Sequence, residues 1–256
     1  METVSSVLQT ALQDLTTDAP ERRDGMDRLI VVLDFPSARG AMDLADRLEG
    51  VCRWFKVGME LYYSAGNAVV EQLRERGFEV FLDLKLHDIP NTVAGGVRSV
   101  AGVGGSLVTI HAGGGEKMMR AAAEAASTPG APRLLAVTVL TSMDAAELAS
   151  VGVSDGADAQ VLRLARLAKA AGINGLVCSA EEVAAVREAM GPDALLVVPG
   201  IRPAGADVGD QNRVATPAEA IARGASMLVV GRPVTQAADP ARAAAAILAE
   251  IEGARG

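Results

Sequence analysis

Short apolar runs with the composition of buried strands recur eight times along this chain of 256 residues, and segments with helical spacing separate them. Near-continuous apolar runs are typical of parallel strands, because helices cover both faces of such a sheet. From Asp34 to Gly231 the spacing averages about 28 residues per unit, which fits a repeated strand–helix crossover. The predicted strands cover residues 29–34, 54–58, 80–84, 107–111, 134–140, 175–178, 195–199 and 227–230.

Eight such units predict an α/β fold, the (β/α)8 TIM barrel, as a single domain. An open doubly wound sheet is the alternative, but it usually carries a glycine-rich turn directly after its first strand, whereas residues 34–37 read DFPS. The first 27 residues are polar with a short helical pattern. We therefore predict an N-terminal extension over residues 1–27 and the catalytic barrel over residues 28–256.

The charge balance restricts the possible partners. Lysine and arginine number 24 against 32 aspartate and glutamate, for a formal net charge of −8. Nucleic acids and anionic membrane surfaces need a basic patch, so neither is an expected partner. The apolar runs fall short of the ~18 residues that span a bilayer, and no signal-peptide pattern is visible. With Cys52 and Cys178 as the only cysteines, we expect reduced thiols and a cytoplasmic protein.

Charged residues of alternating sign lie at or near the ends of the first three predicted strands: Asp34, Lys56, Asp83, Lys85 and Asp88. Because side chains at i and i+2 of a strand share a face, Asp83 and Lys85 should point the same way. A salt-bridged rim that only stabilises the barrel is the alternative interpretation. Several ions converging on one barrel mouth are costly to place beside a core, so the pattern favours a catalytic site.

The last two predicted strands end in residues suited to an anion. Arg202 follows the seventh strand, Gln211 lies in the loop beyond it, and Gly231 and Arg232 follow the eighth strand. Barrels frequently bind a phosphate in these two loops, and arginine offers a fork of donors to phosphate oxygens. Alternatively, Arg232 caps the rim and residues 203–213 form an ordinary loop. The combination of residues at this position favours a phosphate site.

A metal site is not expected. His87 and His111 are the only histidines, and neither has a second histidine or cysteine at ligand spacing. We predict His111 to be a rim or core residue and residues 113–115 to form a turn.

Several motifs resemble those of the orotidine 5′-phosphate decarboxylase family, and the similarity covers essentially the whole chain after residue 27. They are LD at 33–34, FKVG at 55–58, FLDLKLHDIPNTV at 81–93, VTVLTS at 137–142, PGIRP at 199–203 and GR at 231–232. The DxKxxD core is shared with a wider group of barrels that act on sugar phosphates. The continuation IPNT, together with Lys56, is more specific to this family.

The resemblance implies decarboxylation of orotidine 5′-monophosphate to UMP and CO2, without a cofactor or metal. Lys85 would donate the proton to C6, Asp83 would lie beside the departing carboxylate, and Asp88 would hold Lys85 and a ribose hydroxyl. The chemistry of the residues agrees, because a fixed ammonium stabilises the carbanion that loss of CO2 leaves. Lys85 between two carboxylates should stay protonated and can deliver that proton.

The resemblance also implies which residues bind the substrate. Asp34 and Lys56 match the ribose-contacting pair. Thr141 matches a substrate contact on the fifth loop, and its neighbour Ser142 would face the pyrimidine. The remaining matches, on the phosphate side, are Arg202, Gln211, Gly231 and Arg232.

A homodimer with shared sites is implied as well. In the family, the carboxylate that corresponds to Asp88 reaches into the partner subunit's active site, together with Ile89 and Thr92.

Two other functions compete with this one. A related enzyme could act on a hexulose or keto-gulonate phosphate with magnesium, but such relatives place an acidic metal ligand where this chain has Lys56. A nucleotide-binding barrel without catalysis is the second alternative. It has no need for the set Asp83, Lys85 and Asp88, which places a proton donor beside a carboxylate.

Overall fold

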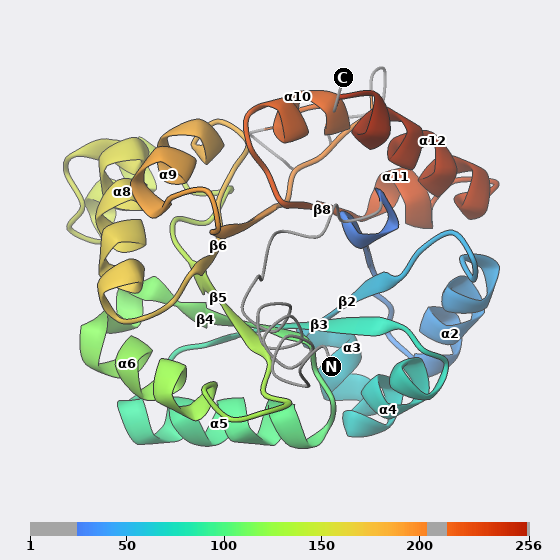
Figure 1. The fold of residues 1–256 in the computed structure, drawn as a ribbon, viewed down its shortest axis with the longest axis horizontal. Helices are drawn as coiled ribbons and strands as arrows, with labels where there is room; N and C mark the ends of the chain where they lie inside the picture. The colour runs from blue at the N-terminus through green and yellow to red at the C-terminus, as the bar shows by residue number, and fades with distance from the viewer. Residues whose placement is uncertain (1–24, 204–213, 255–256) are drawn as a thin grey trace, which may run out of the picture.

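The computed structural model describes residues 25–203 and 214–254, and its eight strands form one closed, entirely parallel barrel (Figure 1). Leu29 in the first strand pairs with Leu228 in the last, which closes the sheet and excludes the open doubly wound alternative. The predicted (β/α)8 barrel is confirmed. The strands are β1 (Leu29–Val32), β2 (Trp54–Gly58), β3 (Glu79–Leu86), β4 (Leu107–His111), β5 (Arg133–Val137), β6 (Gly175–Val177), β7 (Leu195–Val198) and β8 (Met227–Val230).

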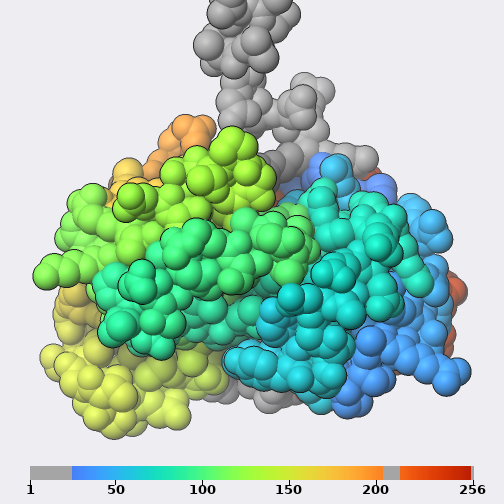
Figure 2. Space-filling model, turned by 90° about the horizontal axis from the view of Figure 1, so that it is seen from below, coloured from blue at the N-terminus to red at the C-terminus, as the bar shows by residue number. Residues whose placement is uncertain are grey.

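Helices surround this inner ring of strands, and Figure 2 views the molecule from the side formed by α4 and α5. Local sequence starts several of them: Asp144 and Thr216 form capping boxes, and a proline occupies the first turn of α5. The helices are η1 (Gly25–Asp27), α2 (Ala38–Arg47), α3 (Met59–Ala65), α4 (Asn67–Glu75), α5 (Pro90–Gly102), η2 (Ala112–Gly114), α6 (Gly115–Ala125), α7 (Ala145–Ser150), α8 (Gly156–Ala170), α9 (Val183–Met190), α10 (Pro217–Ala222), α11 (Arg232–Thr235) and α12 (Pro240–Gly253).

The core has two parts, because alternate residues of each strand face opposite sides. Leu29 and Val31 pack between the strands and the surrounding helices, whereas Ile30 and Val32 pack inside the barrel. The interior cluster consists of Ile30, Val32, Phe81, Leu107, Leu135, Leu195, Val197, Met227 and Val229. The polar residues further along the strands lie above this apolar layer, toward the C-terminal end of the barrel.

Two strand boundaries differ from the prediction in ways that matter for the site. β3 continues to Leu86, so Asp83 and Lys85 lie within the strand and not at its end. β5 stops at Val137, three residues early. The Thr138 hydroxyl donates to the backbone oxygen of Val177, 3.1 Å away, in place of a continuing ladder, and Thr141 therefore lies in a loop.

Residues 25–27 pack against the barrel. The helix η1 contacts β1 and α12, and the Asp27 carboxylate forms an ion pair with Arg53 at 3.1 Å. The predicted boundary at residue 27 stays a prediction, since residues 1–24 lie outside the described part of the chain. No helix within residues 25–203 and 214–254 has the length and apolar character needed to cross a membrane.

Candidate active site

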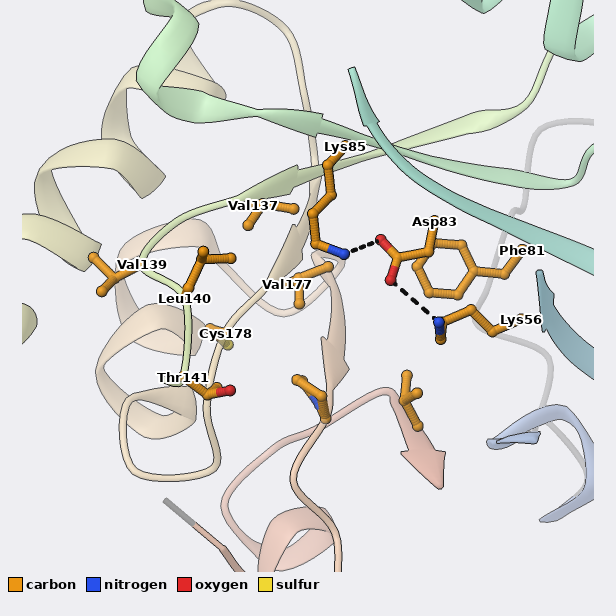
Figure 3. A pocket seen from close by; sticks show the side chains of 12 residues that line it. Lys56, Phe81, Asp83, Lys85, Val137, Val139, Leu140, Thr141, Val177 and Cys178 are labelled. Carbon is orange, nitrogen blue, oxygen red and sulfur yellow. Dashed lines mark hydrogen bonds and ion pairs between the residues drawn. The ribbon is translucent and has the colours of Figure 1, made fainter. Parts of the chain in front are cut away.

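The Asp83 carboxylate is the centre of a chain of charges inside the C-terminal mouth of the barrel. Lys85 Nζ lies 2.9 Å from Asp83 Oδ1, and Lys56 Nζ lies 3.4 Å from Asp83 Oδ2. Lys56 Nζ is also 3.4 Å from Asp34 Oδ1. Figure 3 shows the two ammonium groups pointing at the carboxylate from different sides. Four of the five predicted charged residues therefore meet. Asp34 follows β1, Lys56 lies on β2, and Asp83 and Lys85 lie on β3.

Burial and charge act on Asp83 in opposite directions. Burial alone would raise the pKa of its carboxyl. The positive charges of Lys56 and Lys85, with hydrogen bonds from Lys85 and Thr109, outweigh the burial and hold the pKa below its ordinary value. Asp83 is consequently a carboxylate at neutral pH, and it is fixed in place by both lysines.

Lys85 adopts an unusual backbone conformation. Its φ of 49° is the one positive value that a non-glycine residue shows in the described ranges. Such a left-handed conformation costs on the order of 1–3 kcal/mol and persists only where surrounding contacts impose it. The pairing of β3 with β4 shifts register between Leu82 and Leu86, so Lys85 lies in a bulge. Asp83 and Lys85 meet as predicted, although the strand between them is irregular.

Thr109, on β4, supports this bulge and was not predicted as a site residue. Its hydroxyl oxygen accepts a hydrogen bond from the Lys85 backbone N–H at 2.8 Å and donates to Asp83 Oδ1 at 3.0 Å. The residue is completely buried. Strand alternation from the interior residue Leu107 would have placed Thr109 inside the barrel, which was the available sequence signal.

Gly58, at the end of β2, leaves room for the pair between Lys56 and Asp34. A Cβ atom at this position would lie 2.9 Å from Lys56 Nζ and 3.0 Å from Asp34 Oδ1. Any larger residue must displace at least one of the two charged groups. This requirement explains the glycine in the FKVG motif by the position of Lys56.

The pocket beside the charges has an apolar wall. Val137, Val139, Leu140 and Thr141 line it from β5 and the following loop, and Val177 and Cys178 line it from β6 (Figure 3). Phe81, Pro199 and Val229 complete the lining. Burial raises the pKa of the Cys178 thiol to about 12, so this cysteine is a neutral part of the wall. Such a wall suits a planar, weakly polar ring better than a sugar alone.

The predicted phosphate residues lie beyond strands β7 and β8. Gly231 precedes α11, and Arg232 is the exposed first residue of that helix. Arg202 is buried, and its Nη1 donates to the backbone oxygen of Ile201 at 2.9 Å. Gln211 lies outside the described residues. The phosphate assignment of these four residues stays a prediction.

The three residues predicted to act across a dimer interface lie between β3 and the first turn of α5. Asp88, Ile89 and Thr92 are all exposed. The Asp88 carboxylate accepts a hydrogen bond from the Ile89 N–H at 2.6 Å. Within one subunit's described residues, no ion pair joins Asp88 to Lys85. The predicted contact between them is therefore not formed inside a single chain.

The two histidines lie together at the same barrel end. Their ring centroids are 5.2 Å apart, and His111 is half-buried at the end of β4. Burial lowers the pKa of His111, and the neighbouring charges of His87 and Lys85 lower it further. Within residues 25–203 and 214–254, no three histidine, cysteine, aspartate or glutamate side chains form a cluster suited to a metal ion.

Comparison with known proteins now identifies the family. The model of the orotidine 5′-phosphate decarboxylase / HUMPS family matches residues 27–247. This chain belongs to that family. Orotidine 5′-phosphate decarboxylase of Halorhodospira halophila is 56% identical over 232 residues, covering 90% of this chain and 98% of the relative. The Moorella thermoacetica protein of the same name is 50% identical over 238 residues, covering 90% and 94%.

A solved structure agrees with the family assignment. The crystal structure of orotidine 5′-phosphate decarboxylase from Lactobacillus acidophilus superimposes with a TM-score of 0.79 at 40% identity, covering 88% of this chain and 99% of the other. The family match over residues 27–247 includes Asp34, Lys56, Asp83 and Lys85.

Proposed function

We propose that this chain decarboxylates orotidine 5′-monophosphate to UMP and CO2, a step of pyrimidine biosynthesis, with Lys85 as the proton donor. One observation carries the assignment of roles. The alternating chain Asp34, Lys56, Asp83, Lys85 is assembled beside an apolar wall, in a protein that shares half its residues with relatives named for this reaction.

Lys85 supplies the charge that the reaction needs. When the bond between C6 and the carboxylate breaks, its electron pair stays on C6, and CO2 departs. An ammonium already fixed beside that carbon stabilises the anion without further reorganisation. Lys85 then transfers one proton from Nζ to C6 as a general acid, and the resulting amine recovers a proton from water. The ion pair with Asp83 holds the ammonium in place before substrate arrives.

In this proposal Asp83 lies beside the departing carboxylate. Because the pKa of Asp83 is lowered, its side chain is negatively charged. Repulsion between this charge and the carboxylate of the substrate favours departure of that group as neutral CO2. The apolar wall of Val137, Val139 and Val177 accepts an uncharged product better than an anion.

The remaining polar residues bind parts of the nucleotide away from C6. Asp34 and Lys56 take the ribose hydroxyls, and Thr141, which lines the pocket, contacts the substrate from the loop after β5. The phosphate binds Arg232, with Gly231, Arg202 and Gln211 around it. Binding energy from the distant phosphate can then be used to assemble the site around the reacting carbon.

The active form in this proposal is a homodimer. Ile89 is 67% exposed and Tyr63 76% exposed, and both follow strands that carry site residues. In the proposed dimer these side chains are buried against a second subunit, and Asp88, Ile89 and Thr92 reach into the partner's active site. Cytoplasmic location is also part of the proposal, and its support is the two free, buried cysteines, Cys52 and Cys178.

An ultraviolet assay with orotidine 5′-monophosphate tests the reaction. We expect loss of substrate and formation of UMP at an unchanged rate when a chelator is present. Activity that the chelator abolishes and magnesium restores would support the magnesium-dependent alternative within the same family. Binding of UMP without any turnover of orotidine 5′-monophosphate would support the nucleotide-binding alternative.

Mixing two inactive variants tests the dimer. Lys85→Ala and Asp88→Ala subunits should each be inactive alone. If Asp88 acts across the interface, a mixed dimer contains one intact site, and random exchange restores about a quarter of the wild-type activity. No recovery after verified subunit exchange would show that Asp88 acts within its own chain.

A further inference from the structure

Thr109 is a completely buried polar residue in the middle of β4. It follows Leu107 on the inward face of the strand, so its side chain leaves the apolar layer and meets the charges above it. A buried hydroxyl has a definite cost unless its donor and its acceptor both find partners.

The direction of both hydrogen bonds is fixed by chemistry. The Lys85 backbone N–H can only donate, so the Thr109 oxygen accepts there, at 2.8 Å. The hydroxyl proton is then available for Asp83 Oδ1 at 3.0 Å, and a carboxylate can only accept. One hydroxyl therefore connects the backbone of Lys85 to the side chain of Asp83.

Thr109 also faces the point where the β3–β4 ladder is interrupted. Leu82 pairs with Val108 and Leu86 pairs with Ile110, so three residues of β3 oppose the single residue Thr109. Within this bulge, Lys85 has its left-handed φ of 49°. The Thr109 hydroxyl takes the N–H that a regular ladder would have paired with a backbone carbonyl.

We infer that Thr109 is a positioning residue for the proposed decarboxylation, whose hydroxyl holds the bulge that presents Lys85 and orients the carboxylate of Asp83. This inference rests on the proposed function. Thr109 does not touch the substrate in this scheme and acts through its two neighbours. Without the hydroxyl, the Lys85 backbone loses the hydrogen bond that fixes it, and the distance between the Lys85 ammonium and C6 of the substrate becomes more variable.

Thr109→Val, which keeps the shape and removes the hydroxyl, provides the main test. We expect kcat to fall roughly 10- to 100-fold, since small misplacement of a reacting group has effects of this size. KM should change less than about threefold, because the phosphate and ribose contacts are intact. Thr109→Ser, which restores the hydroxyl, should recover most of the lost kcat.

Ser106→Ala is the matched control. Ser106 lies just before β4 at the opposite end of the barrel, and its hydroxyl likewise accepts from a backbone N–H, that of Val80 at 3.4 Å, and donates to a carboxylate, that of Glu79. We expect its kcat to stay within about threefold of wild type. Equal losses of kcat in Thr109→Val and Ser106→Ala, or no rescue by Thr109→Ser, would overturn the inference. If Thr109→Val does not fold, comparison of Thr109→Ser with Thr109→Ala tests the same hydroxyl with less crowding.

The pH profile provides a readout that general loss of packing would not change. The charged groups that face Asp83 are Lys56 from β2, Lys85 from its own strand and His111 from β4. All three are present in every Thr109 variant, so a difference between variants reports the hydroxyl. The acid limb of kcat/KM should move to higher pH in Thr109→Val and stay in place in Thr109→Ser. An unmoved limb in Thr109→Val would contradict the contact with Asp83.

Amide hydrogen exchange separates this inference from the proposed function. In the unliganded protein, exchange in the segment 81–88 should be faster in Thr109→Val than in wild type, and unchanged in Ser106→Ala. If the wild type fails to turn over orotidine 5′-monophosphate, the proposed function fails, but the exchange experiment still tests the role of the hydroxyl at Lys85. Unchanged exchange in Thr109→Val would overturn that role.

Discussion

The two ends of the barrel both place charged side chains next to the core, and they use them differently. At the N-terminal end, Arg187 donates to the backbone oxygens of Gly191, Pro192, Ala194 and Gly224 and to the Ser226 hydroxyl. At the C-terminal end, Lys85 Nζ has one hydrogen bond among the described residues, to Asp83, although an ammonium carries three donors.

The difference shows which end is built for stability and which for chemistry. The N–H groups of Arg187 donate to backbone oxygens and to the Ser226 hydroxyl of the protein itself, so this side chain has no donor directed at a ligand. Arg74 is similar: it binds Glu79, which also accepts from the Ser106 hydroxyl. Lys85 instead occupies a strained backbone position and keeps donors directed at a pocket. Loss of charge should therefore affect folding at one end and catalysis at the other.

Removing the Lys85 ammonium should have the largest effect. We expect Lys85→Ala to lower kcat by at least about 10³-fold, because the general acid and the stabilising charge disappear together. UMP binding, measured by calorimetry, should remain detectable. Wild-type turnover by Lys85→Ala would contradict the proposed mechanism.

Removing the Arg232 guanidinium should affect binding more than chemistry. We expect Arg232→Ala to raise KM by roughly 10- to 100-fold through loss of charge-assisted hydrogen bonds to phosphate. Steady-state kinetics measures the change, and Arg242→Ala, an exposed arginine on α12, serves as the control. Unchanged substrate affinity in Arg232→Ala would contradict the phosphate assignment.

Adding one methyl group at Gly58 should disturb the charges without disturbing the fold. The Gly58→Ala side chain would displace Lys56 or Asp34, and we expect kcat/KM to fall about tenfold. Gly102→Ala is the control, because a Cβ at Gly102 meets nothing within 4 Å. Equal activity of the two variants would show that Lys56 and Asp34 move aside without consequence.

Removing Arg187 should give the opposite result to Lys85→Ala. Several backbone oxygens lose their donor, so we expect Arg187→Ala to destabilise the fold by about 2–4 kcal/mol and to lower Tm by roughly 5–10 °C. Arg187→Lys should recover only part of this loss, because lysine lacks the planar fork. Below the unfolding transition, kcat should be unchanged. A drop in kcat without a drop in Tm would break the contrast between the two ends.

The smallest effect concerns acid stability. Because the pKa of Asp83 is lowered in the folded protein, its ionised form contributes stability above the unfolded-state pKa, about 3.9. That contribution disappears as pH falls through the lower folded-state pKa. The stability difference between wild type and Asp83→Asn should therefore shrink as pH decreases below about 5. Urea unfolding between pH 7 and pH 3 measures this difference in stability, and a difference that grows in acid would contradict a lowered pKa for Asp83.

Periodicity and spacing were enough to predict the barrel and most of its charged mouth. Each apolar run reports a local property, burial on both faces, and eight of them leave few ways to close a sheet. Asp34, Lys56, Asp83 and Lys85 could be grouped because parallel strands end on one side of a barrel. The strand ends were less certain. β3 runs past Leu84 to Leu86. β5 stops before Leu140, where the Thr138 hydroxyl bonds the backbone oxygen of Val177 in place of a continuing ladder.

Other features depend on contacts between strands that are far apart in sequence. No local sequence pattern predicts the left-handed backbone conformation of Lys85, because the hydrogen bond that holds its N–H comes from Thr109, 24 residues later. The need for glycine at position 58 is likewise visible only in the structure, because a side chain there would contact the ion pair between Lys56 and Asp34. The order of residues along the chain determined which charges reach the barrel mouth. Packing between neighbouring strands decided how those charges are held, because hydrogen bonds and close contacts form only once the barrel is closed.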